Sequence, residues 1–124
     1  MKPHVPNPTG LIAGYINIAQ AIPAAFRSPN VKALMLLAGG IVTFSALIYM
    51  MLEGWAFLDA VYFCVVTMST VGYGDFAPKT ALGKIYTIFY LLIGIGIFVL
   101  TVTAIAEAIY SEFRARSDPP KADD

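Results

Sequence analysis

Residues 67–75 read Thr-Met-Ser-Thr-Val-Gly-Tyr-Gly-Asp and place two glycines, Gly72 and Gly74, at alternate positions. In an ordinary strand the carbonyls alternate in direction, and turning consecutive carbonyls the same way needs left-handed conformations that glycine adopts without steric cost. A row of backbone oxygens turned to one side can replace the water around a dehydrated cation. One such loop cannot surround an ion, so the pattern favours a ring of several copies. The backbone oxygens expected to form the row belong to Thr70, Val71, Gly72 and Tyr73.

The chain has few residues of the types that catalyse reactions or bind metal ions. It has 124 residues with one His and one Cys, and its eight Lys and Arg residues balance its eight Asp and Glu residues. This composition excludes a strongly basic nucleic-acid binder, an acidic disordered chain, a disulfide scaffold and a thiolate zinc cluster. We therefore expect no catalysis, no nucleic-acid partner and no cofactor.

The distribution of charge indicates a membrane protein. Hydrophobic residues make up 58% of the chain and charged residues only 13%, about half the share found in ordinary soluble domains. Residues 33–52 and 85–106 form two charge-free stretches of twenty and twenty-two residues, and about 20 apolar residues are enough to cross a bilayer as a helix. The expected fold is an all-α membrane protein with two transmembrane helices.

A third apolar stretch, residues 60–74, lies between Asp59 and Asp75 and is too short to cross. Its first part fits about three helical turns, and its second part carries the two glycines. A short helix followed by extended chain at membrane depth fits a re-entrant loop, which survives only where it is buried in protein or lines water. The alternative is a tight turn stabilised by the glycines.

The sequence of residues 67–75 resembles the signature of potassium channels, whose filters are rings of backbone carbonyls. The resemblance extends over residues 31–110, to the pore domain of tetrameric potassium channels with two transmembrane helices and a re-entrant pore loop. It implies a homotetramer in which each chain gives an outer helix at about 31–52, a pore helix at about 59–69, a filter at 70–75 and an inner helix at about 83–110. The K⁺-binding residues it implies are Thr70, Val71, Gly72 and Tyr73.

The resemblance also implies residues that support the filter, namely Gly74, Asp75, Tyr62 and Val66. Val66 stands where some bacterial pores have a glutamate, so no carboxylate lies behind the filter here. Tyr62 stands where the family often has a tryptophan, and a hydrogen bond from Tyr62 to Asp75 is expected, the alternative being a solvated Asp75 at the mouth. The side chains of Val71 and Tyr73 are expected to brace the filter against the short helix.

The second charge-free stretch contains Gly94 and Gly96 near its middle. A glycine pair weakens a helix and is consistent with a gating hinge, but small residues also permit close packing of membrane helices. Helical spacing from Gly94 places Ile95, Val99, Thr103 and Ala106 toward the pore. Glu107 would concentrate cations at the inner end or serve as an interfacial carboxylate paired with a basic residue.

The flanks set the expected orientation. Basic residues gather before the first span and after the second, which predicts cytoplasmic termini in a multi-pass protein of the cell membrane. Residues 1–30 are expected to form a cytoplasmic leader without a signal peptide. Within it, residues 11–22 form a short interfacial helix or a loosely packed segment without a role. Residues 111–124 are expected to be a disordered cytoplasmic tail.

The expected function is passive, K⁺-selective conduction through a backbone-carbonyl filter, with the lipid bilayer, K⁺ and further copies of the chain as partners. Two alternatives stay open from the sequence. One is a weakly selective cation channel on the same scaffold. The other is a non-conducting membrane subunit of a larger assembly.

Overall fold

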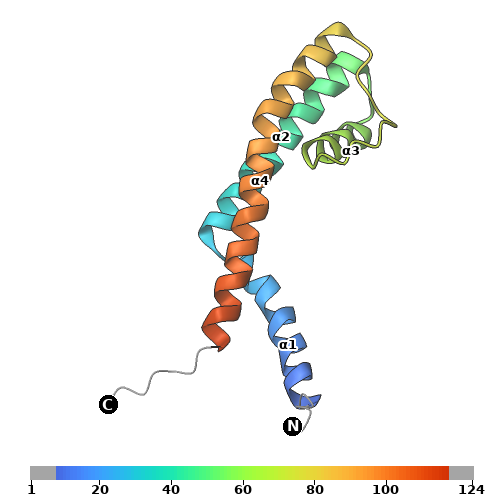
Figure 1. Ribbon diagram of the computed structural model, residues 1–124. Coiled ribbons are helices and arrows are strands. Elements are labelled where there is room, and N and C mark those ends of the chain that lie inside the picture. The colour runs from blue at the N-terminus through green and yellow to red at the C-terminus, as the bar shows by residue number, and fades with distance from the viewer. Residues whose placement is uncertain (1–7, 118–124) are drawn as a thin grey trace. The chain divides into compact units, whose positions relative to one another are not determined.

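The structure is a computed structural model that describes residues 8–117, and it is helical (Figure 1). Four helices are present in this range: α1 (Pro8–Ala25), α2 (Pro29–Glu53), α3 (Phe57–Met68) and α4 (Ala81–Ser117). They contribute to two compact units, one made of residues 33–103 and one made of the chain up to Lys32 together with the chain from Ala104 onward. The expected all-α class is confirmed.

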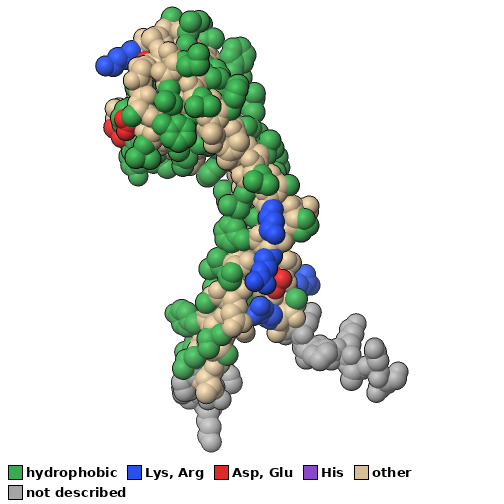
Figure 2. Space-filling view, turned by 180° about the vertical axis from the view of Figure 1, so that it is seen from behind, with side chains coloured by type: hydrophobic (Ala, Val, Ile, Leu, Met, Phe, Trp, Pro, Cys, Tyr) green, Lys and Arg blue, Asp and Glu red, His purple; other side chains and the backbone are tan. Residues whose placement is uncertain are grey.

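Helices α2 and α4 are long and apolar enough to cross a membrane. They contain 25 and 37 residues, and a rise of about 1.5 Å per residue makes both longer than a hydrocarbon core of about 30 Å. Only 17% of the most apolar stretch of each is buried inside the chain, whereas core helices of a soluble protein would be mostly covered. Hydrophobic side chains accordingly cover much of the face shown in Figure 2.

The core of the 33–103 unit is an aromatic cluster centred on Tyr49 of α2, which is fully buried. Its ring stacks on Trp55 at 5.6 Å and meets Phe63 of α3 edge-on at 5.0 Å. The rings of Tyr86 and Tyr90 in α4 also meet it edge-on, at 5.3 and 6.4 Å. One side chain thus joins three helices, and aromatic pairs of this geometry add to the free energy gained by burial alone.

Hydroxyl pairs complete the contact between α2 and α4. Ser45 Oγ lies 2.8 Å from the Tyr86 hydroxyl, and Tyr49 OH lies 2.7 Å from Thr87 Oγ1. Because the single proton of Thr87 is donated to Gly83 O at 2.7 Å, Tyr49 must be the donor to Thr87. No buried side-chain polar atom among the described residues lacks a partner, as an apolar surrounding requires.

The carboxylate of Glu53, at the end of α2, holds the start of α4. It accepts hydrogen bonds from the backbone amides of Lys79 and Thr80 at 2.9 and 3.1 Å and from Thr80 Oγ1 at 2.5 Å. Thr80 Oγ1 in turn accepts the amide of Gly83 at 3.0 Å, so Thr80 serves as the N-cap of α4. The position of Gly83 must stay small, because a Cβ there would overlap Glu53 Oε1.

Replacing Glu53 by Ala is expected to release the chain between α3 and α4. The amides of Lys79 and Thr80 lose their acceptor, so their hydrogen exchange should become at least tenfold faster while amides in the middle of α2 keep their rates. Hydrogen-exchange mass spectrometry measures this, with Glu112→Ala as a control that removes a carboxylate elsewhere. Unchanged protection at residues 79–80 would contradict the assigned role of Glu53.

Helices α1 and α4 extend furthest beyond the expected ranges. Helix α1 begins at Pro8, a residue type favoured in a first turn, and ends two residues after Pro23. Helix α4 continues to Ser117, so the expected disorder from residue 111 is wrong for residues 111–117; residues 118–124 lie outside the described range. Arg114 and Arg116 in the last turn of α4 stabilise the negative end of the helix dipole.

Candidate ion-binding site

Helix α3 is the element that positions the glycine-containing segment. Its buried residues are Ala60, Phe63, Cys64 and Met68, which pack into the aromatic core. Tyr90 of α4 donates a hydrogen bond of 2.9 Å to Cys64 O, so α4 holds the α3 backbone directly. Asp59 lies in the first turn, where its charge is favourable to the helix dipole, although no side chain caps the amino end. The carboxyl end of α3 is therefore fixed where residues 69–75 begin.

Successive amides after α3 turn back toward the last carbonyls of this helix. Thr70 N donates to Thr67 O at 3.0 Å, and Val71 N and Gly72 N both donate to Val66 O, at 3.1 and 3.2 Å. In a planar trans peptide the N–H and the C=O point in opposite directions. Three amides aimed at α3 therefore aim the carbonyls of the preceding residues, Ser69, Thr70 and Val71, away from it.

The backbone dihedrals explain how the chain achieves this. Thr70, Gly72 and Gly74 have φ of 62°, 53° and 77°, so every second residue is left-handed. This alternation keeps consecutive carbonyls on one side. Thr70 is the one non-glycine residue with positive φ in the described part of the chain, and a β-branched residue in this region is strained. Such strain clusters at functional sites, where the surrounding structure holds it in place.

Within one chain, this segment is largely uncovered. The side chains of Val71 and Tyr73 are 53% and 71% exposed, and residues 70–75 are all classed as exposed. The chain itself therefore leaves much of the Val71 and Tyr73 side chains open. Helix α3 meets the segment through the carbonyls of Val66 and Thr67 and through the side chain of Tyr62.

Tyr62 and Asp75 lie together beside the segment. A hydrogen bond from the Tyr62 phenol to the Asp75 carboxylate raises the pKa of Tyr62, with smaller contributions from burial and from the negative charge of Asp75. The Tyr62 ring also meets Phe76 edge-on at 6.2 Å. Val66, behind the segment, contributes its carbonyl oxygen, which accepts the Ser69 hydroxyl at 3.2 Å as well as two amides.

The two glycines of α4 differ in their surroundings. Gly94 is buried, and a Cβ added there would lie 3.3 Å from Met68 Cε, at the end of α3. Gly96 is exposed and has no neighbouring atom within 4 Å of such a Cβ. Gly94 is thus the site of close α4–α3 packing, whereas Gly96 has no packing role in the chain. Of the other residues expected toward the pore, Ile95, Val99 and Thr103 are exposed. Ala106 instead lines an apolar groove between α4 and α1.

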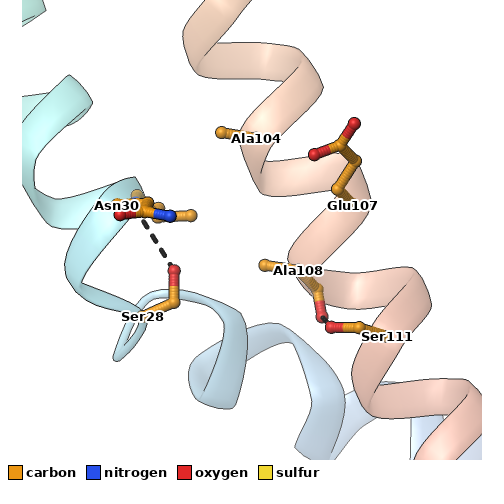
Figure 3. Close-up of a pocket in the computed structure, with 7 residues that line it drawn as sticks. Ser28, Asn30, Ala104, Glu107, Ala108 and Ser111 are labelled. Carbon is orange, nitrogen blue, oxygen red and sulfur yellow. Dashed lines mark hydrogen bonds between the residues drawn. The ribbon is translucent and has the colours of Figure 1, made fainter.

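Glu107 belongs to the other unit and lines a pocket of about 340 Å³. Figure 3 shows it on α4 across from Ser28 and Asn30, with Ser111 one turn further along. Of the two roles expected for Glu107, the pairing with a basic residue is not made in the described part of the chain, where the ion pair formed is between Glu112 and Arg116 at 3.8 Å.

Replacing Gly94 by Leu is expected to displace Met68 and, with it, the end of α3. Overpacking a filled site costs about 1–3 kcal/mol, so the thermal midpoint of the purified protein should fall. Gly94→Ala should keep most of the stability, because the flexible end of Met68 can yield by a few tenths of an ångström. Gly40→Leu is the control, since Gly40 has open space around it. An unchanged thermal midpoint in Gly94→Leu would contradict close packing at this position.

Sequence reasoning missed two residues that position the site. Tyr90 lies one helical turn before Gly94 and therefore on the same face of α4. The sequence could have indicated from this spacing that Tyr90 faces α3. Glu53 could not be found in this way, because its partners lie 26 and 27 residues further along.

Comparisons with known proteins agree with this architecture. A family model described as "Ion channel" matches residues 36–111. Potassium channel protein 1 of Methanocaldococcus jannaschii is 46% identical over 66 residues, which are 53% of this chain and 20% of that protein. Probable potassium channel protein 2 of the same organism is 46% identical over 69 residues, 56% of this chain and 20% of the relative. Potassium channel subfamily K member 18 of Rattus norvegicus is 41% identical over 70 residues, 51% and 17% of the two chains. The match thus spans about a fifth of each relative.

Proposed function

Because this chain belongs to the ion channel family, with potassium channels among its relatives, we propose that it forms a K⁺-selective pore. The observation that carries the proposal is the run of amides at residues 70–72 hydrogen-bonded to the end of α3, which turns the carbonyls of residues 69–71 the other way. The carbonyls of Gly72 and Tyr73 follow in the same alternating backbone, in which Gly72 and Gly74 have positive φ.

Four copies complete the site. One chain offers one row of oxygens, and an ion without its water must be surrounded. Closed symmetric assembly is the common arrangement of homo-oligomers, and rings of four loops form known potassium filters. The exposure of Val71 and Tyr73 supports this assembly, because a neighbouring copy would cover side chains that the chain itself leaves open.

The ring conducts because each position replaces water without holding the ion for long. Carbonyl oxygens of Thr70, Val71, Gly72 and Tyr73, with the Thr70 hydroxyl as an additional ring, coordinate K⁺ at successive sites, and neighbouring ions displace one another. The carboxyl end of α3 adds partial negative charge below the filter, which favours a cation. Transport is passive and follows the electrochemical gradient.

The same proposal assigns an orientation in the cell membrane. Arg27 lies between α1 and α2, Lys32 lies near the start of α2, and Arg114 and Arg116 lie in the last turn of α4. An excess of Lys and Arg marks the cytoplasmic side. Both termini are therefore cytoplasmic, α3 and residues 69–75 form a re-entrant loop reached from the outside, and Glu107 lies near the inner mouth.

Flux measurements with ion substitution test the function. The purified full chain is reconstituted in liposomes loaded with KCl or NaCl, and reversal potentials are recorded in mixed solutions. A potential that follows the K⁺ gradient and ignores the Na⁺ gradient is expected. Equal permeability would replace the proposal by a weakly selective cation channel, and flux no greater than in protein-free liposomes would replace it by a non-conducting subunit.

A further inference from the structure

Helix α1 has a composition that does not suit water. None of the 18 residues Pro8–Ala25 is charged. Its large apolar side chains are exposed on more than one face, with exposed fractions from 45% for Ile22 to 76% for Tyr15. An exposed apolar helix beside membrane-spanning segments is stabilised by the boundary between headgroups and acyl chains.

Helix α1 is nevertheless attached to α4 within its own unit. Ala21 and Ala25 are fully buried, so one narrow face of α1 packs closely. Gln20 Oε1 accepts a hydrogen bond of 2.8 Å from Arg116 of α4. The two helices therefore present a common surface rather than two independent ones.

An apolar groove of about 420 Å³ runs along this surface. Helix α1 contributes Ile18 and Ala21 to it, and α4 contributes Ala106, Ile109, Tyr110 and Phe113. Its walls are almost entirely carbon, so it offers nothing to a polar ligand and suits an alkyl chain.

Cations stand at the end of the groove. Arg114 follows Tyr110 by one helical turn and therefore shares its side of α4, and Arg116 lies next to the groove because it bonds to Gln20. Arg27 and Lys32 belong to the same unit and are exposed. Figure 2 shows Lys and Arg side chains gathered on one face. The carboxylates described in this unit are Glu112, which pairs with Arg116, and Glu107, which lines the separate pocket of Figure 3.

An apolar groove beside the guanidinium group of Arg114, which forms no ion pair with a carboxylate among the described residues, matches an amphiphile with a negative head. We propose that this α1–α4 groove binds an anionic phospholipid of the leaflet next to the termini, with one acyl chain along Ile18, Ala106 and Ile109. Its phosphate meets Arg114 and the basic residues around it.

Lipid binding is measured on the full chain, independently of conduction. The protein is equilibrated in vesicles of phosphatidylcholine and phosphatidylglycerol at 3:1, purified in detergent, and its bound lipids are quantified by native mass spectrometry. Phosphatidylglycerol should be enriched over its share in the vesicles. The double variant Arg27→Gln/Arg114→Gln should lower this enrichment by about fivefold for each basic residue removed. The matched double variant Lys79→Gln/Lys84→Gln removes the same charge elsewhere and should leave it unchanged.

The groove itself is tested by Ala106→Trp, which fills it from an exposed position. Loss of bound phosphatidylglycerol with a normal oligomeric state supports the proposal. Bound lipids in the same 3:1 proportion as in the vesicles on the wild-type protein, or unchanged enrichment in the arginine variant, would overturn it. Loss of assembly in Ala106→Trp with lipid binding intact also overturns it, because a second copy of the chain would then cover the groove. These readouts do not depend on whether the protein conducts K⁺.

Discussion

Gly72→Ala is expected to abolish K⁺-selective flux while leaving membrane insertion and the helices intact. Gly72 has a φ of 53°, and an L-residue in this conformation costs about 1–2 kcal/mol. The cost arises from the backbone, since no atom lies within 4 Å of the added Cβ in the chain. In a ring of four copies this conformational cost arises in every copy. The peptide planes therefore rotate, and the row of carbonyls is broken. We expect K⁺ flux in liposomes to fall at least a hundredfold.

Gly40→Ala is the matched control for this prediction. Gly40 lies within α2 and also has open space around it, but its conformation is helical, and alanine stabilises a helix relative to glycine. Flux should therefore be kept. Normal K⁺ selectivity in Gly72→Ala would show that the left-handed backbone at this position is not what aligns the oxygens.

Tyr49→Ala is expected to have the largest effect on stability. The ring is fully buried and contacts the rings of Trp55, Phe63, Tyr86 and Tyr90. Truncating a buried aromatic side chain typically costs about 3–5 kcal/mol, and here the cavity would open between α2, α3 and α4. We expect a large fall in the thermal midpoint of the purified protein, followed by loss of flux because α3 is no longer held.

Two further variants separate the contributions at Tyr49. Tyr49→Phe removes the hydrogen bond to Thr87 and keeps the ring, so a cost of about 1 kcal/mol is expected. Phe44→Ala removes an aromatic ring from the same helix at a position that is 64% exposed, and it should change the midpoint little. An equal loss in Phe44→Ala and Tyr49→Ala would contradict the central role of the aromatic core.

The two long helices could be predicted from the sequence because charge marks them clearly. The stretch between Lys32 and Glu53 and the stretch between Lys84 and Glu107 carry no charge, and α2 and α4 contain them. The ends of these helices are harder to predict from the sequence. Residues 111–117 are polar and close to two prolines, which favours disorder locally, but the arginines of the last turn and the Glu112–Arg116 pair extend the helix.

Some features of the site could likewise be predicted from the sequence, and others could not. The two glycines at alternate positions indicated where the backbone turns, and positive φ occurs at both, with Thr70 as a third position. What holds the segment could not be predicted, because it depends on contacts between distant elements. The bonds from Tyr90 to Cys64 O and from Lys79 to Glu53 each join residues 26 positions apart. A tyrosine within one apolar helix and a carboxylate at the end of another do not by themselves indicate these partners.

The central claim is that main-chain oxygens of four chains replace the water around K⁺, and it is tested most directly by locating the ion. Crystals of the assembled protein grown with Tl⁺ in place of K⁺ allow the cation to be found by anomalous scattering. We predict fourfold symmetry, with density on the axis between the carbonyl oxygens of residues 70–73. An assembly without fourfold symmetry, or an axis without anomalous density and with those oxygens turned away, would contradict the claim.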